Sequence, residues 1–179
     1  MFKTISHKKI YQNRWLTFYA DSISFPNGAK GVYGYVERNS GVSIAVLDKN
    51  YSILLIEQYR YPTKKCHIEI PAGSIIKGET PEQACLRELA EEAGIYEIEE
   101  LEFLQTYYPL SAHSTETQSL FMARVQRFSE FKGTEFDEDI QSYLVTPIDK
   151  ALKMIDIGKI DDAITSNAIQ LVHRKLNKK

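Results

Sequence analysis

The stretch GSIIKGETPEQACLRELAEEAGI, residues 73–95, combines clear helix boundaries with a dense set of carboxylates. Thr80 is placed as an N-cap, Pro81 suits the first helical position, and Gln83 can reach back to complete a capping box. Gly94 can end the helix because glycine adopts the left-handed conformation at little cost. The stretch therefore predicts a helix that begins at Pro81 and ends at Gly94.

With about 100° of rotation per residue, this helix has an apolar arc and a charged arc. The apolar arc holds Cys85, Leu86, Leu89, Ala90 and Ala93. The charged arc holds Arg87, Glu88, Glu91 and Glu92. We expect the helix to bury the first arc and to present the second to solvent.

Glu88, Glu91 and Glu92 project from adjacent turns, so their carboxylates repel one another unless a cation is present. Mg²⁺ is a cation that takes carboxylate oxygens, waters and phosphate oxygens as ligands. The alternative is a solvated acidic face in which Arg87 and Glu91 form an ordinary i,i+4 ion pair. The spacing within the helix leaves both interpretations open.

The whole stretch matches every fixed position of the Nudix box. Those positions are Gly73, Glu79, Arg87, Glu88, Leu89, Glu91, Glu92, Gly94 and Ile95. The chain thus resembles the Nudix hydrolase superfamily. The resemblance implies an α/β/α sandwich with a mixed β-sheet, in which the box forms a loop, a helix and a second loop, and in which the glutamates of the helix bind Mg²⁺ or Mn²⁺.

Segments outside the box extend the resemblance to ADP-ribose pyrophosphatases and related nucleoside diphosphate sugar hydrolases. Those segments are EQYRYP at 57–62, EIPAG at 69–73 and GKIDDAIT at 158–165. Trp15-Leu16, Asp21-Ser22-Ile23 and Pro26-Asn27-Gly28 are similar to the N-terminal β segment with which such enzymes dimerise. The resemblance implies a homodimer in which residues 1–40 serve dimerisation and base binding, while residues 41–179 form the Nudix hydrolase domain.

The remaining elements follow from local patterns and indicate an α/β domain with helices packed on a sheet. Aromatic and β-branched residues around a Pro-Asn-Gly turn predict a β-hairpin from Trp15–Phe25 and Val32–Val36. Continuous apolar runs predict strands buried on both faces at Val42–Leu47 and Tyr51–Ile56. Further strands are expected at Leu101–Tyr108 and Ser119–Val125, and further helices at Asp149–Ile157 and Asp162–Leu176.

The resemblance also implies roles for residues of the box. Metal ligands would be Glu88, Glu91 and Glu92, together with the backbone carbonyl of Ala72. Glu91 and Arg87 would belong to the catalytic set, Arg87 by steering a glutamate rather than by touching substrate. Glu79 would be either structural or an outer contact of the site.

Substrate contacts are expected outside the box. Arg60 is a candidate phosphate clamp, because a guanidinium matches phosphate with paired donors, and Arg38 is a weaker candidate. A surface ion pair is the alternative for both arginines. Glu69 occupies the position where related enzymes contact ribose or a metal-bound water. Trp15 and Tyr33 correspond to aromatic residues that sandwich the nucleobase, whereas a core position is the alternative for Trp15.

The loop at 108–116 carries the candidate base. ADP-ribose-cleaving relatives have a proline there, followed by a glycine-containing stretch that ends in a glutamate. Pro109 is present and Glu116 can take the glutamate's role, although the glycines are absent and the interval from Pro109 to Glu116 is about two residues longer than in those relatives. His113 is the alternative base, because an imidazole suits proton transfer near neutral pH.

Composition restricts partners and location. The chain has 22 Lys and Arg against 24 Asp and Glu, a net charge of −2 and a pI near 6.1, which argues against nucleic acid or an anionic membrane as partner. Cys66 and Cys85 lie apart, with no zinc-ligand spacing, and the first residues lack an apolar signal region. These features predict a reduced, cytoplasmic protein without a membrane span.

Taken together, the sequence predicts a Mg²⁺-dependent pyrophosphatase that hydrolyses ADP-ribose or a related nucleoside diphosphate sugar to a nucleoside monophosphate and a sugar phosphate. One alternative is a sensor of the same fold that binds a nucleotide sugar without turnover. Another is a Nudix enzyme that acts on a different nucleoside diphosphate derivative.

Overall fold

The computed structural model describes residues 1–128 and 139–178. The chain divides into two compact units. One comprises Met1–Ser40 and Tyr108–Gln118, and the other comprises Gly41–Tyr107 and Ser119–Lys179.

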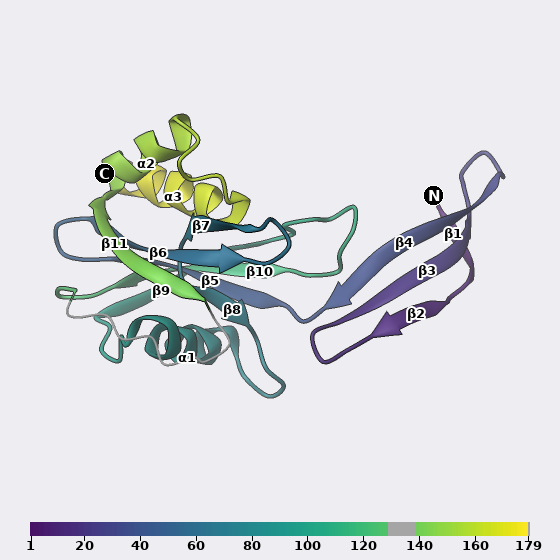
Figure 1. Cartoon of the computed structure of the whole chain (residues 1–179), viewed down its shortest axis with the longest axis horizontal. Coiled ribbons are helices and arrows are strands. Elements are labelled where there is room, and N and C mark those ends of the chain that lie inside the picture. The colour runs from purple at the N-terminus through teal and green to yellow at the C-terminus, as the bar shows by residue number, and fades with distance from the viewer. Residues whose placement is uncertain (129–138, 179) are drawn as a thin grey trace. The chain divides into compact units, whose positions relative to one another are not determined.

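The first unit contains a four-stranded antiparallel sheet arranged around its longest strands (Figure 1). The strands are β1 (Lys3–Ser6), β2 (Lys9–Gln12), β3 (Leu16–Ser24) and β4 (Lys30–Arg38). β3 and β4 pair along their whole length, from Leu16 opposite Arg38 to Ser24 opposite Lys30, which confirms the predicted hairpin. β1 and β2 were not predicted, because they are short and every residue in them is exposed, so no burial pattern marks them.

A buried carboxylate fastens the β1–β2 turn to β3. Asp21 accepts hydrogen bonds from the Lys8 backbone N–H at 3.0 Å and pairs with His7 Nδ1 at 2.9 Å. The His7 bond is the main cause that lowers the pKa of Asp21. These contacts explain how two short polar strands stay attached to the hairpin.

The second unit is built on a seven-stranded sheet in the order β11-β6-β5-β10-β9, with β7 paired to β6 and β8 paired to β5. The strands are β5 (Gly41–Leu47), β6 (Ser52–Arg60), β7 (Lys65–Glu69), β8 (Ala72–Ser74), β9 (Glu100–Tyr107), β10 (Gln118–Arg124) and β11 (Ile140–Pro147). β5 is buried throughout, as its continuous apolar run predicts.

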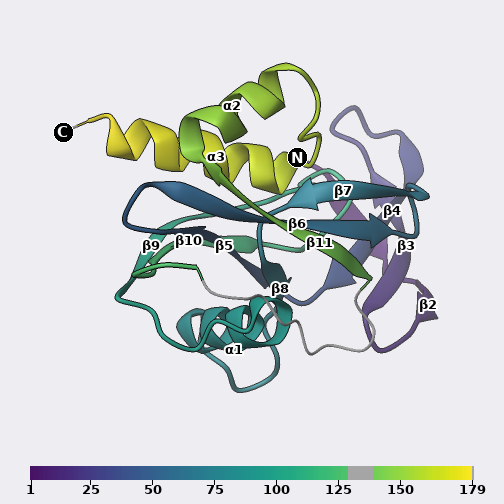
Figure 2. The same ribbon diagram turned by 60° about the vertical axis from the view of Figure 1, so that its left-hand side comes forward.

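Helices cover both faces of this sheet, which confirms the α/β/α sandwich (Figures 1 and 2). They are α1 (Pro81–Ala93), α2 (Ile148–Asp156) and α3 (Ala163–Leu176). Alternate residues of β5 enter different cores: Ile44 packs in the cluster that contains Leu89 of α1, and Leu47 packs in the cluster that contains Ile169 of α3. The sheet therefore separates two hydrophobic cores.

The ends of α1 are those that the sequence predicts. The Gln83 N–H donates to Thr80 Oγ1 at 3.3 Å, and the Thr80 N–H donates to Gln83 Oε1 at 2.9 Å, which completes the capping box. Gly94 ends the helix with φ 64°, in the left-handed region.

The predicted faces of α1 are partly wrong. Leu86 is 45% exposed, whereas Glu88 and Glu92 are only 4% and 1% exposed. The buried face of the helix runs through Ala84, Cys85, Glu88, Leu89, Glu92 and Ala93. The two carboxylates are buried because the β8 strand passes over this edge of the helix. Glu88 and Glu92 of the charged arc therefore face protein, whereas Arg87 and Glu91 are partly exposed.

Thr165 in the first turn of α3 connects that helix to the segment before β8. Its side chain is fully buried, and its Oγ1 accepts a hydrogen bond from the Ile70 N–H at 3.0 Å. Asp162 caps the same turn by accepting from the Thr165 N–H at 2.7 Å. The backbone that leads from Glu69 to Ala72 is thus held by a helix on the opposite side of the sheet from α1.

Replacing Thr165 tests this link. Thr165→Val keeps the shape but leaves the Ile70 N–H buried without its acceptor, so we expect a loss of about 1–3 kcal/mol in the free energy of unfolding. Thr165→Ser keeps the hydroxyl and loses one methyl group, which should cost about 1 kcal/mol. Urea denaturation measures both, and a serine variant less stable than the valine variant would show that methyl packing, not the hydrogen bond, makes the contribution.

Candidate active site

The first contact of the site is between Gly73 on β8 and Glu88 on α1. A Cβ atom placed on Gly73 would lie 1.8 Å from Glu88 Oε1 and 2.0 Å from its Cδ, far inside van der Waals contact. The carboxylate of Glu88 therefore occupies the space that any side chain at position 73 would need. Glycine is required here for close approach rather than for an unusual backbone conformation.

Glu92 is held one turn further along the same helix. Its Oε2 accepts a hydrogen bond from the Ala72 N–H at 3.0 Å. The backbone carbonyl of Glu92 accepts a second hydrogen bond, at 2.6 Å, from the hydroxyl of Tyr143 on β11. The carboxylates of Glu88 and Glu92 are thereby brought against two successive residues of β8.

Arg87 joins the remaining carboxylates. Its Nη1 donates to Glu88 Oε1 at 2.8 Å and to Glu91 Oε2 at 2.7 Å, while its Nε donates to Glu79 Oε1 at 2.8 Å. Its Nη2 donates to Glu79 Oε2 at 3.1 Å and to the Ser74 carbonyl at 2.8 Å. The Arg87 guanidinium lowers the pKa of Glu79, and its bond to Glu79 is the largest cause that raises the pKa of Arg87.

The chemistry of these donors suits a hard divalent cation. Glu88, Glu91 and Glu92 supply carboxylate oxygens from one helix, and the lack of a side chain at Gly73 lets the Glu88 carboxylate lie against β8. Over residues 1–128 and 139–178, no three His, Cys, Asp or Glu side chains are grouped closely enough to hold a metal ion.

Arg60 and Glu69, which the sequence assigns to substrate, form one bidentate ion pair in the same unit. Arg60 Nε lies 2.9 Å from Glu69 Oε1, and its Nη2 lies 2.6 Å from Oε2. Glu69 is buried, whereas the Arg60 side chain is 40% exposed. The ion pair predicted as the alternative for Arg60 is present, while the phosphate and ribose contacts of the two residues stay predictions.

The other unit brings together Arg38 and Glu116, which are far apart in the sequence. Arg38 Nη1 lies 3.3 Å from Glu116 Oε2, and Gln118 Nε2 donates to Glu116 Oε1 at 3.0 Å. The side chain of Glu116 is mostly covered. His113, the alternative base, is exposed in the same loop. The ion pair named as the alternative for Arg38 is thus present, and the role of Glu116 as base stays a prediction.

The aromatic candidates also lie in this first unit. Trp15 is 59% exposed and has the guanidinium carbon of Arg14 4.0 Å from its ring centroid, so the core position considered for it is wrong. Residues 12–17 and 37–39 line a cavity of about 290 Å³ around it. Tyr33 is partly exposed, and its hydroxyl donates to the Ala112 carbonyl at 2.8 Å.

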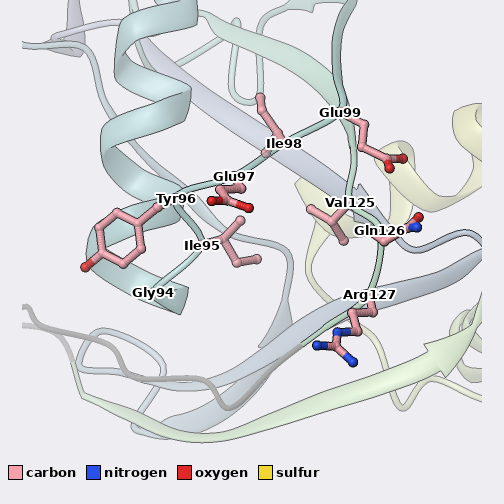
Figure 3. Close-up of a pocket in the computed structure, with 9 residues that line it drawn as sticks. All are labelled: Gly94, Ile95, Tyr96, Glu97, Ile98, Glu99, Val125, Gln126 and Arg127. Carbon is pink, nitrogen blue, oxygen red and sulfur yellow. The ribbon is translucent and has the colours of Figure 1, made fainter.

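A larger cavity, of about 580 Å³, lies elsewhere in the second unit (Figure 3). Its lining comes from two segments, Gly94–Glu99 after α1 and Val125–Arg127 after β10. None of the site residues that the sequence indicates lines it. The carboxylates and arginines described above carry more chemistry than this larger hollow, and we place the site with them.

Some contacts of the site could not be found from the sequence. The Tyr143 hydroxyl reaches Glu92 from β11, a strand that was not predicted, and Thr165 reaches Ile70 from α3. Each contact joins residues more than 50 positions apart, so no local pattern signals it. Among the residues that the structure describes, no helix combines the length and apolar character needed to cross a membrane.

Comparison with known families covers nearly the whole chain. Residues 37–164 match the NUDIX domain, and residues 2–36 match the nucleoside diphosphate sugar hydrolase N-terminal domain. An ADP-ribose pyrophosphatase of Bacillus subtilis (strain 168) is 30% identical over 173 residues, which is 97% of this chain and 93% of that protein. A methanol dehydrogenase activator of Bacillus methanolicus is 32% identical over 169 residues, which is 94% of this chain and 90% of that protein.

A solved structure shares the fold. The crystal structure of an ADP compounds hydrolase superposes with a TM-score of 0.80 and covers 98% of this chain and 94% of its own, at 20% identity. The agreement extends over both units, and it bears on the fold alone.

The Glu79–Arg87 contact predicts a specific pH dependence of stability. Because the folded-state pKa of Glu79 is lowered from 4.5, its contribution is complete above that pH and is lost as the pH falls through the lowered value. We expect Glu79→Gln to lower the urea midpoint near neutral pH, and the difference from the wild type to shrink below pH 4.5. Glu97→Gln makes the same charge change at an exposed site and is the control. A difference that stays constant down to pH 3 would contradict the role given to the ionised pair.

Proposed function

Because the chain belongs to the NUDIX domain family, we propose that it is a cytosolic, divalent-metal-dependent pyrophosphatase. Its substrate is ADP-ribose or a related nucleoside diphosphate sugar, which it hydrolyses to a nucleoside monophosphate and a sugar phosphate. The observation that carries the proposal is the pair of buried carboxylates, Glu88 and Glu92, fixed against Ala72 and Gly73. Burying two acidic groups is costly, which favours a functional reason for their position.

Mg²⁺ or Mn²⁺ would be held by Glu88, Glu91, Glu92 and the carbonyl of Ala72. When bound, the ion supplies charge neutralisation for the diphosphate and a more acidic water. Ala72 holds Glu92 through its N–H, and Gly73 leaves room for Glu88, so contacts with β8 orient both carboxylates. Glu91 has the most accessible side chain of the three, which suits its assignment to both the metal and the catalytic set.

Arg87 and Arg60 have different roles in this proposal. Arg87 holds Glu79, Glu88 and Glu91 and steers the carboxylates rather than touching the substrate. Arg60 is oriented by Glu69 and presents a partly exposed guanidinium, which would bind a phosphate group of the diphosphate. Glu69, at the other end of that pair, would contact the ribose or a water.

Glu116 would accept the proton of the attacking water. Its carboxylate is held by Gln118 and faces Arg38, so its orientation is fixed before substrate binds. Arg38 would then add positive charge beside the base.

The substrate class rests on the N-terminal segment and on the relatives. Residues 2–36 match a domain named for nucleoside diphosphate sugar hydrolases, and the Bacillus subtilis relative is an ADP-ribose pyrophosphatase. Trp15 is exposed beside Arg14, which suits stacking on a nucleobase, with Tyr33 as a second aromatic surface. We propose a homodimer formed through residues 1–40, where several large apolar side chains are exposed.

A substrate panel tests the reaction. We expect purified protein with millimolar Mg²⁺ to release a monophosphate from ADP-ribose or from another member of a panel with GDP-mannose, UDP-glucose and dinucleoside diphosphates. Glu92→Gln should lower kcat by about 100-fold or more, because it removes a charged metal ligand. Glu97→Gln, at an exposed site beyond α1, is the matched control and should keep full activity.

Two outcomes would overturn the proposal. One is the absence of any monophosphate from the whole panel. The other is tight ligand binding that Glu92→Gln leaves unchanged without turnover in either protein, which would favour the sensor.

Replacing Trp15 tests base binding. If its ring stacks on the nucleobase, Trp15→Ala should raise KM about tenfold with little change in kcat. Tyr96→Ala removes an exposed aromatic ring from the other unit and should leave KM unchanged. Light scattering checks the expected dimer. An unchanged KM in Trp15→Ala would remove this residue from the substrate site.

A further inference from the structure

The hairpin of β6 and β7 carries a charged face that the metal site does not include. Pairing places Arg60 opposite Lys65, Gln58 opposite His67 and Ile56 opposite Glu69. Because side chains alternate along a strand, these residues share one face of the hairpin. Three basic residues lie on that face: Arg60, Lys65 and His67. Over Ser52–Glu69, all of it described, the only other acidic residue is Glu57, which lies on the opposite face.

A second carboxylate reaches this face from the segment before α3. Asp161 Oδ1 lies 2.8 Å from His67 Nδ1, and Asp161 Oδ2 pairs with Lys65 Nζ. The bond from Lys65 is the largest cause that lowers the pKa of Asp161, to about 2. Asp161 therefore stays ionised and contacts two of the three bases.

Each of the two carboxylates, Asp161 and Glu69, binds different basic side chains. Asp161 binds Lys65 and His67, and Glu69 binds Arg60 in the bidentate pair. Lys65 sits directly opposite Arg60 and has a long, flexible side chain. Without the charge of Asp161, Glu69 would be the remaining carboxylate on this face, and Lys65 would compete with Arg60 for it.

The same aspartate also reaches the backbone of Arg60. His67 Nε2 lies 2.7 Å from Thr63 Oγ1, and that hydroxyl donates to the Arg60 carbonyl at 3.1 Å. The Lys64 N–H donates to the same carbonyl at 3.0 Å, and Lys64 is left-handed with φ 58°. Thr63, His67 and Asp161 follow the order hydroxyl, imidazole, carboxylate of a catalytic triad. The Thr63 hydroxyl donates its proton to a backbone carbonyl, however, so these bonds stabilise the turn rather than activate a nucleophile.

We propose that Asp161 is a positioning residue. By binding Lys65 and His67 it leaves Glu69 to pair with Arg60, and this pair orients the Arg60 guanidinium toward the diphosphate of the substrate. This inference rests on the proposed function for the identity of the ligand. Lys65 and His67, which Asp161 binds, would otherwise compete with Arg60 for Glu69. The site thus extends to the segment before α3, a helix that packs on the face of the sheet opposite α1 (Figure 2).

Asp161→Asn is a clean test because it removes the charge and keeps the size. The side chain is partly exposed, and Asp162, not Asp161, caps α3, so we expect the variant to fold. KM for the hydrolysed substrate should rise about fivefold with kcat within about twofold of the wild type. Asp156→Asn, on the exposed part of α2, is the matched control and should change neither.

A second substitution separates positioning from general support of the fold. If Lys65 competes for Glu69, Lys65→Met in the Asp161→Asn protein should restore KM to within about twofold of the wild type. Lys65→Met alone should have little effect. A KM that stays raised in the double variant would overturn the proposal, because a structural defect is not repaired by removing a second side chain.

Hydrogen exchange of the Arg60 Nε–H, followed by ¹⁵N NMR, reports the ion pair without any substrate. We expect exchange about tenfold faster in Asp161→Asn and slow exchange again in the double variant. If this pattern holds while no panel compound is hydrolysed, the proposed function fails and the positioning role stands. If hydrolysis occurs but neither KM nor the exchange rate changes in Asp161→Asn, the positioning role is wrong and the proposed function stands.

Discussion

The guanidinium of Arg87 contacts both the loop before α1 and the helix itself, and the arrangement of the site depends on it. It binds Glu79 and the Ser74 carbonyl on the loop side, and Glu88 and Glu91 on the helix side. A lysine could not make these contacts, because a compact ammonium lacks the planar fork that reaches several acceptors at once. The carboxylates stay close together because one cation lies between them, and the loop is held at the distance that lets Gly73 approach Glu88.

This arrangement costs stability, and the rest of the second unit offsets the cost. Glu88 and Glu92 lie on the buried face of α1, where apolar residues would contribute more to folding. The sheet supplies the compensation, since it has a hydrophobic core on each face and a central strand, β5, that is buried throughout. Thr165 and Tyr143 add hydrogen bonds that fix the segment before β8 and the end of α1.

The sequence predicts those features that depend on residues close together in the chain. The capping box and Gly94 give both ends of α1, the continuous apolar run gives β5, and the Pro-Asn-Gly turn gives the β3–β4 hairpin. Features that depend on tertiary contact were missed. β1 and β2 are too short and exposed to show a pattern, and the burial of Glu88 depends on a strand that crosses the helix. Arg60 and Glu69 were both identified, but their pairing depends on a register that the sequence does not reveal.

The acidic residues that are crowded in the sequence bind different basic residues in the structure. Ten glutamates lie from Glu69 to Glu102 with only Lys77 and Arg87 among them, and three of these glutamates pair with basic residues of other elements. Arg60 pairs with Glu69 from β6, and Lys175 pairs with Glu102 from α3. Glu79, Glu88 and Glu91, in contrast, bind an arginine of their own stretch, Arg87. A local excess of acidic residues therefore indicates a functional site when the basic residue that binds them lies in the same segment. There the carboxylates are held together around one cation, whereas elsewhere they bind separate partners.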